Sequence, residues 1–244
     1  MGWEDPGTGV PETVRTALAD QPVAGRTCLE AGAGVGNTTA GLLEAGARRV
    51  YAVTDDADHA ATVRERCGDD DRLVVLRGDL RQTPLATDSV DLVTAHALCT
   101  VLDPPALADV VGELTRVAAP DCHLVVDDYA PLPVDAAMRR LVAVVNAASE
   151  LADGRPALSF YPSTLLRRLF EGHGWRFDRE TTLLDPVPWT AKHLRAHLVL
   201  VKQSTERLPP DLGDPLEQRA DRLVDEVAAT SVGTMYSLAF HQGT

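Results

Sequence analysis

Three glycines at alternate positions follow the first short apolar run of the chain. The segment 28–39 reads CLEAGAGVGNTT and places Gly32, Gly34 and Gly36 between an expected strand and an expected helix. Glycine permits positive φ angles there and lets a ligand approach the backbone closely, and the N–H groups at a helix start can bind a polar or anionic group. Glu30, just before the turn, adds a carboxylate that can pair with a cation. The pattern therefore predicts a ligand site at the end of the first strand.

Two cofactor classes compete for this loop. The dinucleotide fingerprint G-x-G-x-x-G would need its third glycine where this chain has Asn37. The spacing G-x-G-x-G behind an acid instead resembles motif I of the class I S-adenosylmethionine-dependent methyltransferases, whose loop wraps the methionine part of the cofactor. A nearby carboxylate such as Glu30 suits a ligand with an ammonium and a sulfonium group, whereas it would repel a pyrophosphate. An α/β turn that needs glycine only for its geometry is the alternative.

The resemblance continues, in order, from about residue 24 to residue 126. The second expected strand ends in Thr54, Asp55 and Asp56, where the family places a carboxylate that holds both ribose hydroxyls. Ungapped counting from the glycine loop arrives at Thr54, so that Asp55 or Asp56 has to supply the carboxylate, and we favour Asp55. The alternative is that these acids only solvate the end of a strand.

Three further landmarks lie downstream. The segment RGDL at 77–80 is similar to the family's Gly-Asp-apolar segment, which implies an adenine contact through Asp79 beside the Leu80 backbone. The segment PLATDSVDLV at 84–93 looks like the family's fourth-strand signature, and LTRVAAP at 114–120 resembles the usual helix end before the fifth strand. One departure follows at 121–123, where DCH replaces the family's paired glycines.

Residues just after the fourth and fifth strands are expected to face the transferred methyl group, because ligands of such sheets lie beyond the carboxyl ends of the strands. Methyl transfer is a direct displacement that needs an aligned acceptor, and histidine can serve as its general base near neutral pH. We predict His96 as base or cofactor-side contact, Asp128 and Tyr129 as residues that orient the substrate, and Ala95 beside the cofactor. A packed histidine bonded to backbone is the alternative for His96.

The order of expected elements predicts an α/β fold: a Rossmann-like, doubly wound, mostly parallel seven-stranded sheet with helical lid insertions. One methyltransferase-like domain is expected to span 1–244, with a cofactor-binding core at about 22–130 and lid or substrate insertions at about 131–165 and 190–230. The expected strands are 26–31, 49–54, 73–77, 90–95, 122–127, 175–184 and 234–241. The expected helices begin near residues 11, 37, 57, 105, 134, 163, 190 and 216, and prolines 209, 210 and 215 are assigned to the linker before the last one.

The composition limits the classes of substrate and the cellular compartments that we expect for this protein. The 244 residues carry a formal net charge of −13, which disfavours a nucleic-acid partner because polyanions are held by clustered Lys and Arg. Four widely spaced cysteines form no C-x-x-C pair, so no metal site is expected. No apolar run approaches the roughly 20 residues of a membrane span, and the acidic segment 1–6 has no apolar region typical of a signal peptide. We expect a cytoplasmic protein that acts on a small molecule.

Three functions remain open at this stage. The leading hypothesis is S-adenosylmethionine-dependent methylation of a hydroxyl or amine of a small molecule, in the setting of specialised metabolism and biosynthesis. The second is an enzyme of this fold repurposed for cyclisation, elimination or rearrangement without methyl transfer, for which Thr54 and the missing glycines at 121–122 are mild indications. The third is a non-catalytic partner subunit, and either a homodimer or a partner subunit is compatible with the sequence.

Overall fold

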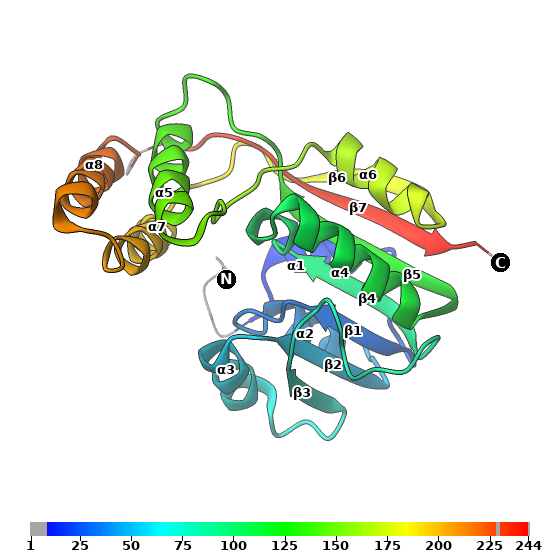
Figure 1. The fold of residues 1–244 in the computed structure, drawn as a ribbon. Helices are drawn as coiled ribbons and strands as arrows, with labels where there is room; N and C mark the ends of the chain where they lie inside the picture. Colours follow the sequence, from blue (N-terminus) through cyan, green and yellow to red (C-terminus); the bar gives the residue numbers. More distant parts are fainter. Residues whose placement is uncertain (1–8, 228–229, 244) are drawn as a thin grey trace.

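A seven-stranded sheet forms the centre of the protein in the computed structural model, which describes residues 9–227 and 230–243 (Figure 1). The strand order is β3-β2-β1-β4-β5-β7-β6. Every pairing is parallel except those that β7 makes with β5 and β6. The strands are β1 (Thr27–Ala31), β2 (Arg49–Thr54), β3 (Leu73–Arg77), β4 (Val90–His96), β5 (Ala118–Tyr129), β6 (Trp175–Leu184) and β7 (Met235–Gln242). The predicted mostly parallel α/β sheet is therefore confirmed.

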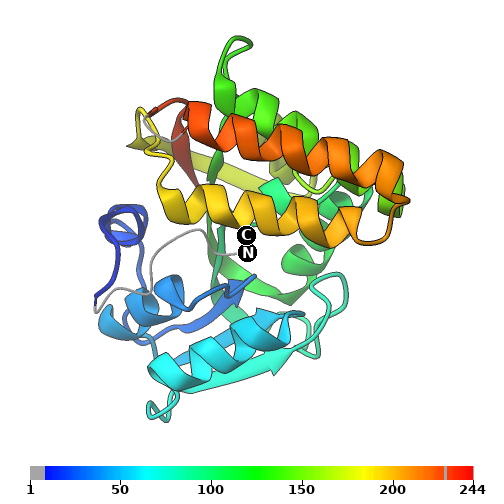
Figure 2. The ribbon, with the colours of Figure 1, turned by 90° about the vertical axis from the view of Figure 1, so that its left-hand side faces the viewer.

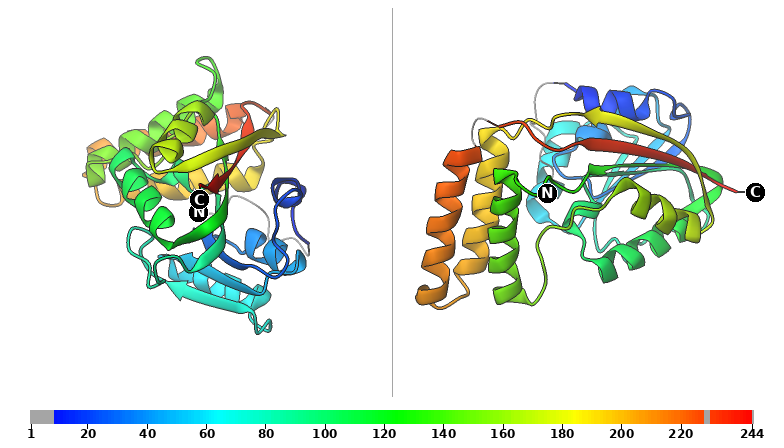
Figure 3. Two further views of the ribbon diagram at one scale, coloured as in Figure 1. Left: turned by 90° about the vertical axis from the view of Figure 1, so that its right-hand side faces the viewer. Right: turned by 90° about the horizontal axis from the view of Figure 1, so that it is seen from above.

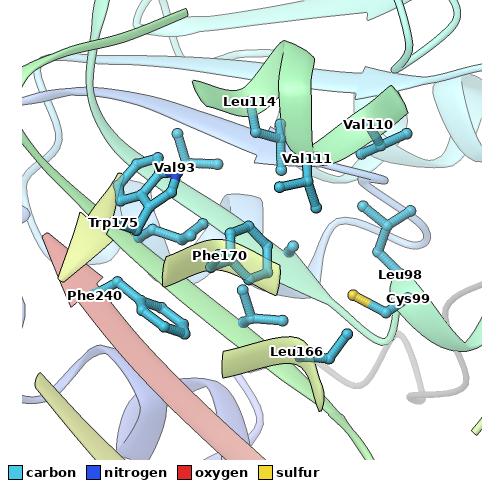
Figure 4. Close-up of a cluster of buried hydrophobic side chains, with 14 of the residues drawn as sticks. Val93, Leu98, Cys99, Val110, Val111, Leu114, Leu166, Phe170, Trp175 and Phe240 are labelled. Carbon is cyan, nitrogen blue, oxygen red and sulfur yellow. The ribbon is translucent and has the colours of Figure 1, made fainter. Parts of the chain in front are cut away.

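Helices cover both faces of this sheet (Figure 3). One face carries α1 (Glu12–Leu18), α2 (Asn37–Glu44) and α3 (Ala57–Cys67), and the other carries α4 (Pro104–Val117) and α6 (Ser163–Gly172). The larger apolar core lies under α4 and α6, where Phe170, Trp175 and Phe240 are buried (Figure 4). The indole Nε1–H of Trp175 donates to Thr115 Oγ1 on α4 over 2.9 Å, so the one polar group of this large side chain is satisfied inside the core.

Three further helices form a bundle beyond the carboxyl ends of the parallel strands (Figures 1 and 2). They are α5 (Ala137–Asp153), α7 (Ala191–Thr205) and α8 (Pro210–Val227). Leu141, Leu194 and Leu223 are buried between them, and the same cluster includes Trp189 from the segment that leads into α7. The bundle occupies the segments predicted to form lid insertions. That it covers an acceptor stays a prediction.

One residue near the end of the predicted first insertion, 131–165, packs away from the bundle. Tyr161 belongs to the core under α4 and α6 rather than to the bundle. Its hydroxyl donates to the backbone O of Leu102 over 2.8 Å, and its own backbone O accepts from the hydroxyl of Tyr236 over 2.8 Å. Two bonded tyrosines therefore tie this part of the segment to the sheet.

Two elements begin well before the residue predicted for them. Helix α8 begins at Pro210, because proline fits the first turn of a helix, where its missing N–H costs nothing. Pro215 lies beyond that first turn, inside the helix. Strand β5 begins at Ala118 and pairs with Val90. The glycine-free segment 121–123 is accommodated by Asp121 at a φ of 62°, one of the residue types that tolerate this region.

Some predictions concern residues outside this description. The acidic segment 1–6 and the predicted helix end at 229 lie outside the described residues. Among residues 9–227 and 230–243, no helix combines the length and apolar character that crossing a bilayer requires.

Substitution of two adjacent leucines of α6 tests how this helix packs against the core. Leu166 is fully buried, whereas Leu165 is 45% exposed. We expect Leu166→Ala to lower the free energy of unfolding by about 2–5 kcal/mol because it leaves a cavity. Leu165→Ala is the matched control, with an expected change within about 0.5 kcal/mol. Urea denaturation followed by circular dichroism measures both, and equal effects would contradict the placement of α6.

Candidate functional site

A cavity of about 380 Å³ opens at the carboxyl ends of β1, β2, β3 and β4. It brings together the glycine turn, the acids after β2, the Gly-Asp segment after β3 and the residues that end β4. Its lining consists of Gly32, Gly34, Thr54, Asp55, Asp56, His59, Gly78, Asp79, Leu80, Arg81, His96, Ala97, Leu98, Val101, Leu102, Ala106, Val110 and Arg155. Six residues predicted to bind the cofactor or to act in catalysis therefore share one cavity: Gly32, Gly34, Asp55, Asp79, Leu80 and His96.

The glycine turn needs glycine for two separate reasons. Gly32, Gly34 and Gly36 have φ angles of 78°, 48° and 79°, in the left-handed region where other residues are strained. A Cβ atom on Gly32 would also lie 3.0 Å from Leu98 Cδ1. The third glycine, Gly36, is the N-cap of α2 and is absent from the cavity lining, so its predicted cofactor contact has no support in this geometry.

The acids after β2 have different tasks. Asp56 is the N-cap of α3, and its Oδ1 accepts from the N–H groups of Asp58 and His59 over 2.8 and 3.0 Å. The bond from His59 is the main cause that lowers the pKa of Asp56. Thr54 Oγ1 accepts from Asp56 N over 3.2 Å. Asp55 is exposed, lines the cavity and takes part in neither contact, so the geometry favours it over its two neighbours as the ribose ligand.

Asp79 is paired with a residue that the sequence analysis did not single out. Its Oδ2 lies 2.6 Å from Arg81 Nη2, and this pair lowers the pKa of Asp79. Arg81 also lines the cavity. An adenine amino group would therefore share the carboxylate with Arg81 or displace it, at little cost because both side chains are about half exposed.

Three ionisable groups meet below the glycine turn. Glu30 is buried and accepts a hydrogen bond from the Thr39 hydroxyl, and burial raises the pKa of Glu30 to about 7. Glu30 and His96 both line a small cavity of about 20 Å³ beside Gly34. His96 Nδ1 lies 3.0 Å from Asp127 Oδ2. Asp127 comes from the neighbouring strand and was not among the predicted site residues.

The remaining predicted residues lie elsewhere. Asp128 is buried and accepts hydrogen bonds from the Thr100 N–H over 3.0 Å, from the Thr100 hydroxyl and from the Tyr129 N–H. It therefore supports the turn after β4, and it is absent from the cavity lining. The Tyr129 ring packs 5.9 Å from that of Trp189 under the bundle. Ala95 is buried inside the sheet, and its neighbours His96 and Ala97 line the cavity instead.

Asp128 and Tyr129 have packing contacts in this structure, and their contact with a substrate stays a prediction. The described residues contain no group of three or more His, Cys, Asp or Glu side chains that could hold a metal ion.

A pair of alanine variants separates the roles of the adjacent acids. Asp55→Ala is expected to weaken S-adenosylhomocysteine binding by about 10- to 100-fold, because hydrogen bonds to a charged group are lost, and to leave stability unchanged. Asp56→Ala should instead cost about 1 kcal/mol of stability through loss of the helix cap. Calorimetry and thermal denaturation measure the two effects, and the reverse pattern would assign the ribose to Asp56.

Binding should also depend on pH through Glu30. Because burial raises the pKa of Glu30 to about 7, the group is neutral below that pH and becomes able to attract an ammonium group above it. The affinity for S-adenosylhomocysteine should therefore rise with pH, by up to about tenfold per unit on approaching pH 7. Glu30→Gln should remove the rise, while the exposed Glu44→Gln should retain it. A rise that persists in Glu30→Gln would exclude Glu30 as the ammonium partner.

Part of the chain is similar in sequence to known methyltransferases. Residues 29–126 match a family model described as a methyltransferase domain. A demethylmenaquinone methyltransferase from Clavibacter sepedonicus is 35% identical over 123 residues, which are 50% of this chain and 48% of that protein. The match thus spans about half the length of this curated relative.

Solved structures extend the similarity to nearly the whole chain. The geranyl diphosphate C-methyltransferase from Streptomyces coelicolor A3(2), solved with Mg²⁺, geranyl diphosphate and S-adenosyl-L-homocysteine, has a TM-score of 0.61 at 15% identity over 94% of this chain and 77% of its own. The (4+2)-cyclase SpnF has a TM-score of 0.64 at 13% identity over 95% of this chain and 80% of its own. At these identities the likeness shows the fold alone. Residues 29–126 therefore match the methyltransferase-domain model, and nearly the whole chain shares the fold of solved structures that include methyltransferases.

Proposed function

We propose that the protein transfers a methyl group from S-adenosylmethionine to a hydroxyl or amine of a small molecule. The observation that carries this proposal is the single cavity in which the glycine turn, Asp55, Asp79 and His96 meet. Its volume of about 380 Å³ lies within the usual range for small-molecule sites, about 300–1,000 Å³.

The residues present fit the cofactor by type and by position. Gly32 and Gly34 would face its methionine part, and Glu30 would meet the ammonium group. Asp55 would hold the ribose hydroxyls, and Asp79 with the Leu80 backbone would meet the adenine. When bound, S-adenosylmethionine supplies an electrophilic methyl carbon, and the chain's own residues have to align the acceptor and accept its proton.

A small acceptor suits the charge of the site. Asp55, Asp56 and Asp79 line the cavity, and the whole chain carries −13, so a nucleic-acid backbone would be repelled. The Streptomyces structure described above is a complex with a small molecule, geranyl diphosphate, and with S-adenosyl-L-homocysteine. His96 at the cavity favours an acceptor that has to lose a proton.

The repurposed-enzyme hypothesis loses its two sequence indications. Thr54 bonds the backbone N–H of Asp56 while Asp55 remains at the cavity, and Asp121 adopts the positive φ expected of the missing glycine. Both departures therefore have local structural explanations that leave the cofactor residues in place. Methyl transfer is the function we carry forward.

Calorimetry with S-adenosylmethionine and S-adenosylhomocysteine tests the cofactor. Both are expected to bind, and Gly34→Val should weaken binding at least tenfold because a branched side chain would enter the cavity and strain a positive φ. Gly25→Val is the matched control: Gly25 also has a positive φ, of 75°, but lies outside the cavity. Equal loss in both variants, or no binding by the unmodified chain, would refute the cofactor assignment.

Methyl transfer itself requires an acceptor. The chain is incubated with S-adenosylmethionine carrying a deuterated methyl group and a panel of small molecules bearing hydroxyl or amino groups. Mass spectrometry then reports products that have gained the labelled methyl. Cofactor binding with no labelled product across the panel would count against hydroxyl and amine acceptors.

A further inference from the structure

We propose that Asp127 is a positioning residue that fixes His96 as the general base for an acceptor hydroxyl or amine. This inference rests on the proposed function and deepens it, because it selects acceptors that must give up a proton. Asp127 itself touches neither acceptor nor cofactor in this proposal and acts through His96.

The pair is built into the middle of the sheet. His96 ends β4, and Asp127 is its register partner on the parallel strand β5. His96 Nδ1 lies 3.0 Å from Asp127 Oδ2, with only 10% and 6% of the two side chains exposed. Both backbones are held by ladders of hydrogen bonds, so the contact does not depend on a loop conformation.

A purely structural explanation fits Asp127 less well than it fits the next residue. Both carboxylate oxygens of Asp128 accept hydrogen bonds, from Thr100 and from the Tyr129 backbone. Asp127 Oδ1, in contrast, is buried and accepts no hydrogen bond within the described residues. An unsatisfied buried carboxylate oxygen costs stability, so its presence calls for an explanation, and a catalytic role is one such explanation.

The contact sets the tautomer of His96. A carboxylate can only accept, so Nδ1 has to carry the proton that bonds Asp127, and Nε2 is the basic nitrogen. The His96 side chain lines both the main cavity and the small cavity beside Glu30. Any proton exchanged with a bound acceptor therefore uses Nε2.

The resulting step balances. As the acceptor oxygen or nitrogen forms its bond to the methyl carbon, the carbon–sulfur bond breaks and its electron pair stays on sulfur. The acceptor's proton passes to His96 Nε2, and the imidazolium later releases it to water. Asp127 stabilises the imidazolium without taking the proton.

The surrounding charges favour this direction of transfer. Asp127 from β5 contacts His96 directly, and the carboxyl groups of Asp128 from β5 and Glu30 from β1 are near enough to interact with it electrostatically. His59 and Arg155 line the same main cavity. Carboxylates near the ring stabilise its protonated form, so a proton taken from the acceptor is held while the new bond forms.

Nitrogen NMR of ¹⁵N-histidine-labelled protein tests the tautomer directly, with signals assigned by comparison with His96→Gln. The unmodified chain should show His96 protonated at Nδ1 and unprotonated at Nε2. Asp127→Asn should reduce this tautomer and lower the midpoint of the His96 titration by roughly one pH unit. Asp178→Asn is the matched control, since Asp178 Oδ1 lies 2.7 Å from His241 Nδ1 at an exposed site outside the cavity, and it should leave the His96 signals unchanged.

Activity gives a second readout that a packing role would not move. With an acceptor from the panel, Asp127→Asn should lower kcat by about 100-fold or more, leave the KM for S-adenosylmethionine within about threefold and shift the pH profile. A higher KM for S-adenosylmethionine together with a lower kcat, at an unaltered pH profile, would overturn the proposal.

The outcomes separate this inference from the proposed function. If the unmodified chain shows His96 protonated at Nε2, the inference fails even if the variant does not fold. The inference also fails if Asp127→Asn leaves the tautomer and the titration unchanged. Absence of S-adenosylhomocysteine binding would instead refute the proposed function, and the NMR measurement would still report whether Asp127 sets the tautomer.

Discussion

The turn that leaves β1 has to satisfy its backbone while it keeps one side open to a ligand. The N–H groups of Gly32 and Ala33 both donate to the backbone O of Val53 over 3.0 Å, which holds the turn against the end of β2. Leu98, from the segment after β4, has its Cδ1 atom 3.0 Å from where a Cβ atom on Gly32 would be. The turn thus contacts β2 and the segment after β4 at once. A side chain at Gly32 would have to displace the end of the Leu98 side chain, and it would also be strained at this positive φ.

The buried carboxyl group of Glu30 lies below the same turn. A buried carboxylate without a cation is unfavourable, and the neutral form of Glu30 is accordingly favoured up to about pH 7. The bond from Thr39 on α2 opposes this effect of burial without cancelling it. Glu30 is therefore poised so that an arriving cation would stabilise its ionised form. A pyrophosphate would add like charge at the same place, which is the physical reason why an acid before the loop argues against a dinucleotide.

Much of the fold follows from local sequence patterns. The bounds of β2, α3, β3 and β6 agree with those predicted, because each is a short apolar or alternating run, or a capped helix, between clear turn residues. The prolines before and inside α8 were assigned to a linker. A single sequence does not show that Pro210 falls in the first helical turn, or that packing against α5 and α7 compensates for Pro215. Tertiary contacts decide such cases, and these contacts are not local.

Some residues of the candidate site could likewise be predicted from local sequence, and others could not. Motif positions and expected strand ends predicted Gly32, Asp55, Asp79 and His96, since each lies at or just after the end of a strand and parallel strands end at one edge. The choice between Asp127 and Asp128 could not be made from sequence. Successive residues of a strand point to opposite faces, so the choice depends on the register of β5 against β4. That register places Asp127, and not Asp128, beside His96.

The residues proposed for proton transfer and the helices proposed to select the acceptor belong to different parts of the fold. His96 and Asp127 are fixed by central strands, whereas the bundle of α5, α7 and α8 joins the sheet through connecting segments. Arg155 follows α5 and lines both the main cavity and a groove of about 550 Å³ between α5 and α7, and Val101 after β4 does the same. Substitutions in the bundle can therefore reshape the surface next to the cavity while the two strands keep the histidine and its carboxylate in place. If His96 acts as the proposed base, a rigid base beside an adjustable wall would let one fold serve different acceptors.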